Sequence, residues 1–281
     1  MPRGMPVEHT IAFIGAGNMA GALIRGLIGT GTIPADRIIA ADPDQARLNA
    51  LETELEVGVT GDNAEAVKEA TVVVLATKPQ VLPQVLPGLA ATIGPDTLVV
   101  SIAAGISTDM IERAFPAGSR VIRTMPNTPA LVGAGATAIA AGSHATDDDL
   151  ELAETLFRSV GISVRVPEEQ IDAVTGLSGS GPAYVFAMIE ALRDAGVREG
   201  LPEETALRLA SQTVFGAARL LLDEDEAPDV LRDRVTSPGG TTRAGLDALA
   251  AAGFEDAILG AVRAATRRSV ELGKIAESSE D

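Results

Sequence analysis

Apolar residues follow two different patterns along this chain, and the change falls near Pro167. Before it, they form short continuous runs, at 10–15, 37–42, 71–77 and 97–104, with further candidates at 120–126, 135–142 and 163–166. Such runs are typical of parallel strands that are buried on both faces of a sheet. Helical stretches such as MAGALIRGLIG and DQARLNALETEL separate them, so this part predicts an α/β fold with a doubly wound parallel sheet.

After Pro167 nearly every segment has the period of a helix. The longest are GPAYVFAMIEALRDAG, PEETALRLASQTVFGAARLLLD and GFEDAILGAVRAATRRSVELG. A chain of 281 residues has room for two modest domains, each with its own core. The sequence therefore predicts an α/β domain over residues 1–166 and an all-helical domain over residues 167–281, ending in a disordered tail at 277–281.

The motif IGAGNMA, residues 14–20, follows the first predicted strand and begins a predicted helix. Gly15 permits a tight turn, Gly17 lets the backbone approach a pyrophosphate, and the N–H groups from Asn18 onward attract negative charge. Ala20 replaces the third glycine of the dinucleotide fingerprint, which the pattern allows. Accidental glycines are the alternative, but the strand and the helix agree with the motif. It predicts a Rossmann-type dinucleotide site at Gly15, Gly17, Asn18, Met19 and Ala20.

Asp42 stands at the end of the second predicted strand, where a carboxylate would accept hydrogen bonds from the ribose of the adenosine half. A carboxylate there would repel a 2′-phosphate and so favours NAD(H) over NADP(H). Arg47, one helical turn further on, could accommodate that phosphate or could be an ordinary solvated arginine. The preference between NADH and NADPH therefore stays open.

Ligands of open α/β sheets lie beyond the carboxyl ends of the strands. In this chain such ends carry LATKPQ (75–80), SIAAGIS (101–107) and MPNTP (125–129). Lys78 could instead belong to a helix start, and MPNTP could be a rigid turn between strands. The predicted cofactor contacts beyond the glycine motif are Asp42, Asn63, Ala76, Thr77, Lys78, Pro79, Ala103, Ala104, Gly105 and Asn127.

Composition narrows the possible partners. The formal net charge is −17, which argues against nucleic acid and anionic membranes and suggests the solvated acidic surface of a halophilic protein. There are no cysteines, and nothing near the two histidines has metal-ligand spacing, so we expect no metal site. We find no apolar run that would cross a bilayer and no secretion signal, and we expect a cytoplasmic protein.

The segment VTSPGGTT, residues 235–242, interrupts the helices of the second part. A proline and two glycines break regular structure, and two threonines then lead back into the helical pattern AGLDALAAA. Pro238 and the glycines would expose the first N–H groups of the next helix, where the helix dipole and unpaired donors attract a carboxylate. The alternative is a loop that only caps a helix.

Six motifs occur in a fixed order along the chain: IGAGNMA, TKPQ, SIAAGIS, MPNTP, GLSGSGPAY (176–184) and VTSPGGTT. Together they closely resemble the pyrroline-5-carboxylate reductase family, whose members make proline. The resemblance extends from about Thr10 to Lys274, and PGGTT and GSGPAY are its specific parts. The glycine fingerprint alone would not separate this family from other reductases.

The resemblance implies an N-terminal Rossmann domain that binds NAD(P)H and a C-terminal helical dimerisation domain. It also implies active sites shared between protomers, in a homodimer or a ring of dimers. The implied reaction is hydride transfer from the nicotinamide to the imine carbon of 1-pyrroline-5-carboxylate, giving L-proline. The implied substrate-binding residues are Ser178, Gly239, Gly240, Thr241 and Thr242, and Thr242, placed to hydrogen-bond the ring nitrogen, is the implied catalytic group.

No histidine, cysteine or carboxylate of these motifs offers itself as a proton donor. An imine that is already protonated near neutral pH would need mainly orientation. Two alternatives remain. A hydroxyacid dehydrogenase would carry a lysine acid/base in the helical domain, where Lys274 is the only lysine. A non-enzymatic dinucleotide sensor would have no use for VTSPGGTT.

Overall fold

The computed structural model describes residues 9–224 and 226–278. The N-terminal stretch examined for a secretion signal lies almost wholly outside this range, as do the last three residues of the predicted disordered tail. The first two residues of that tail belong to the helix α12 (Phe254–Ser278). The chain forms two compact units, Met1–Gly179 with Ala264–Asp281, and Ser180–Arg263.

The first unit is built on one sheet, which has eight strands among the described residues. The strands are β1 (Ile11–Ile14), β2 (Ile38–Ala41), β3 (Gly58–Thr60), β4 (Val72–Leu75), β5 (Leu98–Ser101), β6 (Arg120–Met125), β7 (Gly135–Ala141) and β8 (Gly161–Arg165). Their order is β3-β2-β1-β4-β5-β6-β7-β8, parallel from β3 to β6, with β7 antiparallel to β6 and β8 parallel to β7. The predicted doubly wound sheet is confirmed. The chain reverses its direction of winding between β1 and β4, the position where open α/β sheets bind ligands.

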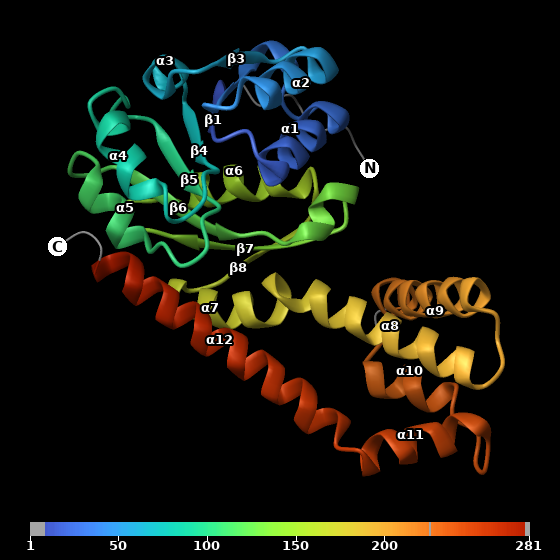
Figure 1. Cartoon of the computed structure of the whole chain (residues 1–281). Coiled ribbons are helices and arrows are strands. Elements are labelled where there is room, and N and C mark those ends of the chain that lie inside the picture. The colour runs from blue at the N-terminus through green and yellow to red at the C-terminus, as the bar shows by residue number, and fades with distance from the viewer. Residues whose placement is uncertain (1–8, 225, 279–281) are drawn as a thin grey trace. The chain divides into compact units, whose positions relative to one another are not determined.

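Helices cover both faces of this sheet (Figure 1). On one face pack α1 (Asn18–Thr30), α2 (Gln45–Leu55) and α6 (Asp147–Arg158), and on the other α3 (Asn63–Val67), α4 (Leu82–Ala90) and α5 (Thr108–Ala114). A short 3-10 helix, η1 (Ala35–Arg37), precedes β2. The alternation of strands and helices thus has the two-sided cover that continuously apolar strands require.

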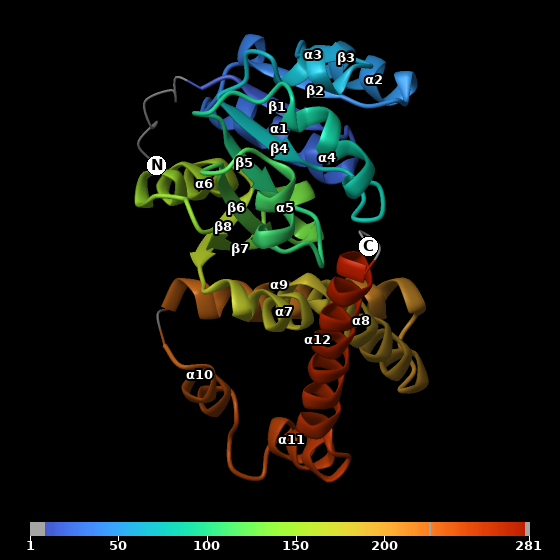
Figure 2. The ribbon, with the colours of Figure 1, turned by 90° about the vertical axis from the view of Figure 1, so that its left-hand side faces the viewer.

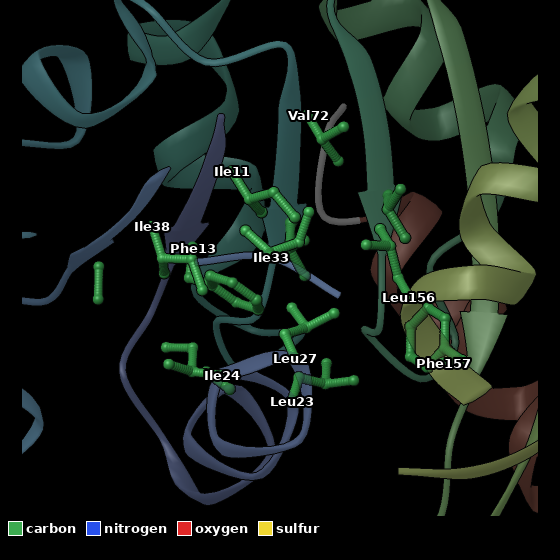
Figure 3. Close-up of a cluster of buried hydrophobic side chains, with 14 of the residues drawn as sticks. Ile11, Phe13, Leu23, Ile24, Leu27, Ile33, Ile38, Val72, Leu156 and Phe157 are labelled. Atoms are coloured by element: carbon green, nitrogen blue, oxygen red, sulfur yellow. The ribbon is translucent and has the colours of Figure 1, made fainter. Parts of the chain in front are cut away.

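The core on the α1 side joins β1, α1 and α6 (Figure 3). Phe13, Leu27 and Phe157 belong to this cluster, each 1% exposed. Side chains of this size stabilise the fold by about 1.5–3 kcal/mol each when they are fully buried. Ala12 and Ile14, the neighbours of Phe13 in β1, are buried in the cluster on the opposite face. Both faces of β1 are therefore apolar, which explains its uninterrupted apolar run.

Residues 167–179 and the C-terminal half of α12 complete the first unit. They contain η3 (Glu168–Gln170), α7 (Ile171–Val174) and a π-helical turn, η4 (Thr175–Gly179). Ile171 is buried against β7, and Ser269 of α12 donates a hydrogen bond to Asp172 at 2.6 Å. Figures 1 and 2 show the C-terminal end of α12 beside α5.

The second unit consists of helices that bury little among themselves. It contains α8 (Gly181–Arg198), α9 (Glu203–Glu224), α10 (Pro228–Arg234), α11 (Thr241–Ala251) and the beginning of α12. In its described part, Ala206 and Ala210 are the only buried apolar residues, whereas Phe186, Phe215 and Leu222 are 63–77% exposed. Large apolar side chains left open to this extent mark a surface that associates with another protein.

Candidate active site

The two glycines that begin the dinucleotide motif have different surroundings. Gly15 has φ +103°, and a Cβ atom added to it would lie 2.8 Å from the carbonyl carbon of Ala76 at the end of β4. A Cβ atom added to Gly17 would meet nothing within 4 Å. Gly15 is therefore required by the packing of the chain itself, and Gly17 leaves open space next to the helix start. Ala20 is fully buried and helps to seat α1 on the sheet.

The N-terminus of α1 is prepared for an anion. Gly17 is its N-cap, no side chain of the described residues caps it, and its first turn contains no acidic residue. Asn18 is exposed at the first helical position and Met19 packs partly against the core. Free N–H groups at the positive end of a helix bind phosphate without further help. This end of α1 lies beside the β1–β4 switch point, as the sequence predicts for a pyrophosphate site.

Asp42 lies just beyond β2 and is 7% exposed. Its Oδ2 accepts a hydrogen bond from the N–H of Ala16 at 2.8 Å, and its Oδ1 accepts one from the N–H of Asp44 at 2.9 Å. The carboxylate thus fixes the glycine turn and the β2–α2 turn together. Each carboxylate oxygen has a second lone-pair site, so these bonds leave room for a ribose hydroxyl.

The ends of β4 and β5 line the same edge of the sheet. Within the described residues, Thr77 has a buried Oγ1 without a hydrogen-bond partner. A buried hydroxyl left without a partner is rare in proteins and fits a position that a ligand completes. Lys78 beside it is exposed, and Pro79 follows before α4. Beyond β5, Ala103 is buried, Ala104 is exposed and Gly105 has φ +76°.

Gly105 also meets the C-terminal half of α12. A Cβ atom added to Gly273 would lie 3.3 Å from the carbonyl oxygen of Gly105, which is closer than ordinary contact. Two glycines therefore permit a close approach of backbone to backbone. The approach supports the loop after β5 from the side of α12.

Asn63 begins α3 on the far side of β2 and is half-buried. The side chain of Asp62 caps this helix by accepting from the N–H of Ala64 at 2.9 Å. Because β3 is the parallel neighbour of β2, the start of α3 lies at the same edge of the sheet as Asp42. The placement at this edge is compatible with the predicted cofactor contact of Asn63, which stays a prediction.

Asn127 links two of the predicted motifs. It is the N-cap of η2 (Thr128–Val132) in MPNTP, and its Oδ1 accepts from the N–H of Ala136 at 2.8 Å. Its Nδ2 donates to the carbonyl oxygen of Ser178 in the π-helical turn at 3.0 Å. The Ser178 hydroxyl donates to the carbonyl of Val174 at 3.2 Å. The Asn127 side chain therefore holds MPNTP against GLSGSG, and the Ser178 hydroxyl is bound within its own segment. π-helical turns of this kind often occur at functional sites.

A buried arginine supports this region, and the sequence reasoning did not identify it. Arg123 in β6 has a side chain that is 8% exposed, and it pairs with Glu168 at 3.1 Å. Glu168 also accepts from the N–H of Thr108 at 2.7 Å and from its hydroxyl. The signal in the sequence was an arginine in the middle of the predicted strand RVIRTMP. A charge buried on a strand needs a partner, and Glu168 supplies it.

In the second unit, VTSPGGTT forms a tight turn followed by a helix. The N–H of Gly240 donates to the carbonyl of Ser237 at 3.0 Å, and Gly239 has φ +68°. Proline at the second position and a glycine of positive φ at the third make this a type II turn. Gly240 is then the N-cap of α11, which begins at Thr241, and no side chain of the described residues caps it. The prediction that this segment exposes a helix start is confirmed.

Thr241 and Thr242 occupy the first two positions of α11 and are exposed. Their N–H groups and hydroxyls add up to four donors within one turn of helix. A carboxylate needs no cation at such a site, because the helix dipole and the donors suffice.

Neither histidine belongs to these motifs. His9 precedes β1 and lies 2.9 Å from the Thr71 hydroxyl before β4, at the amino edge of the sheet. Burial, followed by the charge of Arg120, lowers the pKa of its imidazole. His144 follows β7, whose end pairs with the beginning of β6 and so lies at that same edge. The described residues contain no group of His, Cys, Asp and Glu that could hold a metal ion, and no helix among them is long and apolar enough to span a membrane.

Two family models match the chain. The model for pyrroline-5-carboxylate reductase dimerisation matches residues 168–272, and the model for NADP oxidoreductase, coenzyme F420-dependent, matches residues 10–105. A pyrroline-5-carboxylate reductase of Synechocystis sp. is 50% identical over 264 residues, which cover 94% of this chain and 98% of that protein. This chain belongs to the pyrroline-5-carboxylate reductase family.

Other members of the pyrroline-5-carboxylate reductase family agree along the whole chain. The protein of that name from Methanosarcina acetivorans is 47% identical over 95% of this chain and 99% of its own. The solved structure of the Coxiella burnetii reductase is 39% identical, with a TM-score of 0.91, over 95% of this chain and 99% of that one. The Plasmodium falciparum enzyme, solved with NADP bound, is 30% identical, with a TM-score of 0.84, over 96% and 100%.

Family membership makes the chain an NAD(P)H-dependent oxidoreductase. The first unit fits that cofactor on its own evidence, through the uncapped start of α1, the open space at Gly17 and the unpartnered hydroxyl of Thr77. The exposed apolar side chains of the second unit fall within the residues that the dimerisation model matches, and they fit self-association.

Proposed function

We propose that this chain reduces the C=N bond of 1-pyrroline-5-carboxylate to give L-proline, and that the uncapped start of α11 holds the substrate. The observation that carries this proposal is the type II turn Ser237–Gly240, which presents the first N–H groups of α11 without a capping side chain in the described part of the chain. A basic side chain is not needed to bind the substrate carboxylate, because the start of the helix has a positive electrostatic potential of its own.

The cofactor site of the proposal lies at the β1–β4 switch point. The N–H groups from Asn18 onward hold the pyrophosphate, with Gly15, Gly17, Met19 and Ala20 shaping the turn. NAD(P)H supplies the hydride when it is bound. The remaining proposed contacts are Asp42, Asn63, Ala76, Thr77, Lys78, Pro79, Ala103, Ala104, Gly105 and Asn127.

Asn127 and Ser178 act in this proposal as a pair. The hydrogen bond from the Asn127 amide to the Ser178 carbonyl fixes the π-helical turn that carries Ser178. The amide of Asn127 donates one hydrogen bond to backbone and accepts one from backbone, so besides its proposed cofactor contact it positions these two segments. An error of about 1 Å in such positioning costs about a hundredfold in rate.

Thr242 is the proposed catalytic group. Its hydroxyl hydrogen-bonds the ring nitrogen, while Gly239, Gly240, Thr241 and the backbone N–H groups hold the carboxylate. An imine that is protonated in solution arrives ready to accept hydride, so the chain has to orient it and exclude water. Both histidines lie at the opposite edge of the sheet from the cofactor motifs, in agreement with a reaction that needs no histidine as proton donor.

Residues 1–166 serve as the dinucleotide-binding part and residues 167–281 as the dimerising and substrate-binding part. The functional form is a homodimer or a ring of dimers in the cytoplasm, with no nucleic-acid or membrane partner. The charge of −17 supports this choice of partners and a halophile-like surface.

The direct test is a spectrophotometric assay of purified protein with 1-pyrroline-5-carboxylate and each reduced nicotinamide. Oxidation of the nicotinamide with formation of proline is expected. Oxidation with small ketoacids instead would favour the hydroxyacid dehydrogenase alternative, and binding of NAD(P)H without turnover would favour a dinucleotide sensor.

Thr242→Ala tests the catalytic assignment. We expect kcat to fall about 100-fold, the usual effect of losing one proton-transfer or orienting group, with little change in the Kd of the nicotinamide. Thr242→Ser keeps the hydroxyl and is expected to restore most of kcat. Equal losses of kcat and nicotinamide affinity in Thr242→Ala would assign the residue a structural role.

A further inference from the structure

In this fold the turn between β2 and α2 faces the adenosine ribose of a bound dinucleotide, and in this chain the side chains of that turn are held in place. Asp42 is nearly buried, with one carboxylate oxygen bound to the N–H of Ala16 and the other to the N–H of Asp44. The carboxylate therefore cannot turn away from the end of β2 without leaving two backbone donors unpaired. Its charge stays where the ribose of a dinucleotide lies in this fold.

A second carboxylate occupies the start of α2. Asp44 is the N-cap, and its Oδ1 accepts from the N–H of Ala46 at 3.0 Å and from the N–H of Arg47 at 3.4 Å. The start of a helix is a favourable place for a phosphate, but here the chain fills it with its own anion. Asp44 thus removes donors that a 2′-phosphate would need.

The nearest basic side chain is already shared between these two acids. Nε of Arg47 lies 3.3 Å from Oδ2 of Asp44, and its Nη1 lies 3.8 Å from Oδ2 of Asp42. Arg47 is also the only basic residue between positions 42 and 65 in the sequence. A phosphate placed here would have to compete with two fixed carboxylates for a single guanidinium.

We propose that Asp42 and Asp44 make this chain selective for NADH by excluding the 2′-phosphate of NADPH. The inference deepens the proposed function and rests on it, since it concerns the same cofactor site. It resolves the two possible roles of Arg47, which neutralises Asp42 and Asp44 and does not bind the phosphate.

The test measures binding without turnover. The Kd values of NADH and NADPH are obtained by titration calorimetry with the full chain, together with those of adenosine 5′-phosphate and adenosine 2′,5′-bisphosphate, which lack the nicotinamide. The wild-type chain is expected to bind NADH at least about tenfold more tightly than NADPH, a difference of about 1.4 kcal/mol. The two adenosine phosphates should show the same order.

Two single variants and their combination address the mechanism. Asp44→Ser keeps a good N-cap and removes one charge, and Asp42→Asn keeps an acceptor for Ala16 and removes the other. The ratio of the two Kd values is the readout, because a general weakening of the site cancels in it. We expect the Kd of NADPH divided by the Kd of NADH to fall several-fold in each single variant. In the double variant this ratio should approach one or fall below it.

Glu52→Gln is the matched control. It removes one carboxylate from the exposed side of the same helix, about 12 Å further along, a distance at which salt screens most of the interaction. The ratio should stay as in the wild type.

The outcomes separate this inference from the proposed function. A wild-type chain that binds NADPH as tightly as NADH, or variants that leave the ratio unchanged, would overturn the selectivity assigned to Asp42 and Asp44. A chain that prefers NADH in binding but forms no proline would leave the selectivity intact and reject the reductase function.

Discussion

At Gly15, just after β1, the absence of a side chain allows the backbone to pass close to Ala76 at the end of β4. The residue combines φ +103° with a neighbouring carbonyl group that an added Cβ would approach to 2.8 Å. Gly17, two residues later, has φ −74°, which suits any residue, and open space where its side chain would be. One glycine therefore serves the fold, and the other leaves room for a ligand.

Exchanging each of these glycines for alanine should separate the two roles. Gly15→Ala is expected to lower the free energy of unfolding by about 2–5 kcal/mol, since a positive φ costs about 1–2 and overpacking about 1–3. Gly17→Ala should leave the free energy of unfolding almost unchanged and weaken NAD(P)H binding at least about tenfold, because its methyl group takes the space of the pyrophosphate. Urea unfolding and calorimetric titration measure the two effects. Loss of stability in Gly17→Ala would show that its open surroundings serve the fold.

At the scale of the element, long periodic helices and buried strands were predictable. α1 and α8 begin within one residue of their predicted starts. Both starts are marked in the sequence by a glycine or proline next to a segment with helical periodicity. β3 was missed, since it has three residues, starts with a glycine and is not buried. α4 was missed because Pro83 and Pro87 lie within it.

Contacts between distant residues were harder to predict. Asp42 was expected to meet the ribose, and its bond to Ala16 depends on how two turns pack, which spacing does not encode. Glu168 and Arg123 lie 45 residues apart and meet only once the sheet is assembled. Residues 167–179 read as helical from their period, and their packing against β7 follows from tertiary contacts of Ile171.

The turn Ser237–Gly240 is the element on which substrate binding depends. Gly239→Ala should strain this turn, because the φ of +68° at Gly239 costs an alanine about 1–2 kcal/mol. We expect a rise of about tenfold in the KM for 1-pyrroline-5-carboxylate and an unchanged Kd for NAD(P)H, since the first unit is not altered. Pro238→Ala is the control, because alanine accepts the negative φ of that position. A change in nicotinamide affinity without a change in KM would contradict the role given to the turn.

At the scale of the whole molecule, the second unit has too little core to be stable alone. Its described residues bury two alanines, while α9 carries a surface hollow lined by residues that include Leu209 and Phe215. A helical unit of this size gains stability by burying such a face against a second copy.

Phe215→Asp should therefore weaken the proposed dimer. Each buried phenylalanine contributes about 1.5–3 kcal/mol, and a symmetric dimer loses two of them, so its dissociation constant should rise by more than about 100-fold. Sedimentation velocity over a range of protein concentrations measures the change. Asp223→Asn, at an exposed position of the same helix, should leave the dimer intact. A dimer unaffected by Phe215→Asp would place the interface on another face of the unit.

Net charge opposes the same association. Two chains of charge −17 repel each other as they approach, and salt screens the repulsion, with a Debye length of about 30 Å at 0.01 M and about 3 Å at 1 M. We therefore expect the dissociation constant of the dimer to fall by about tenfold or more as NaCl rises from about 0.01 M to about 0.5 M. Sucrose at matched osmolality controls for exclusion of solutes from the surface, and should act less strongly. If salt instead dissociates the dimer, ion pairs between subunits outweigh the repulsion, and the acidic surface cannot be what limits assembly.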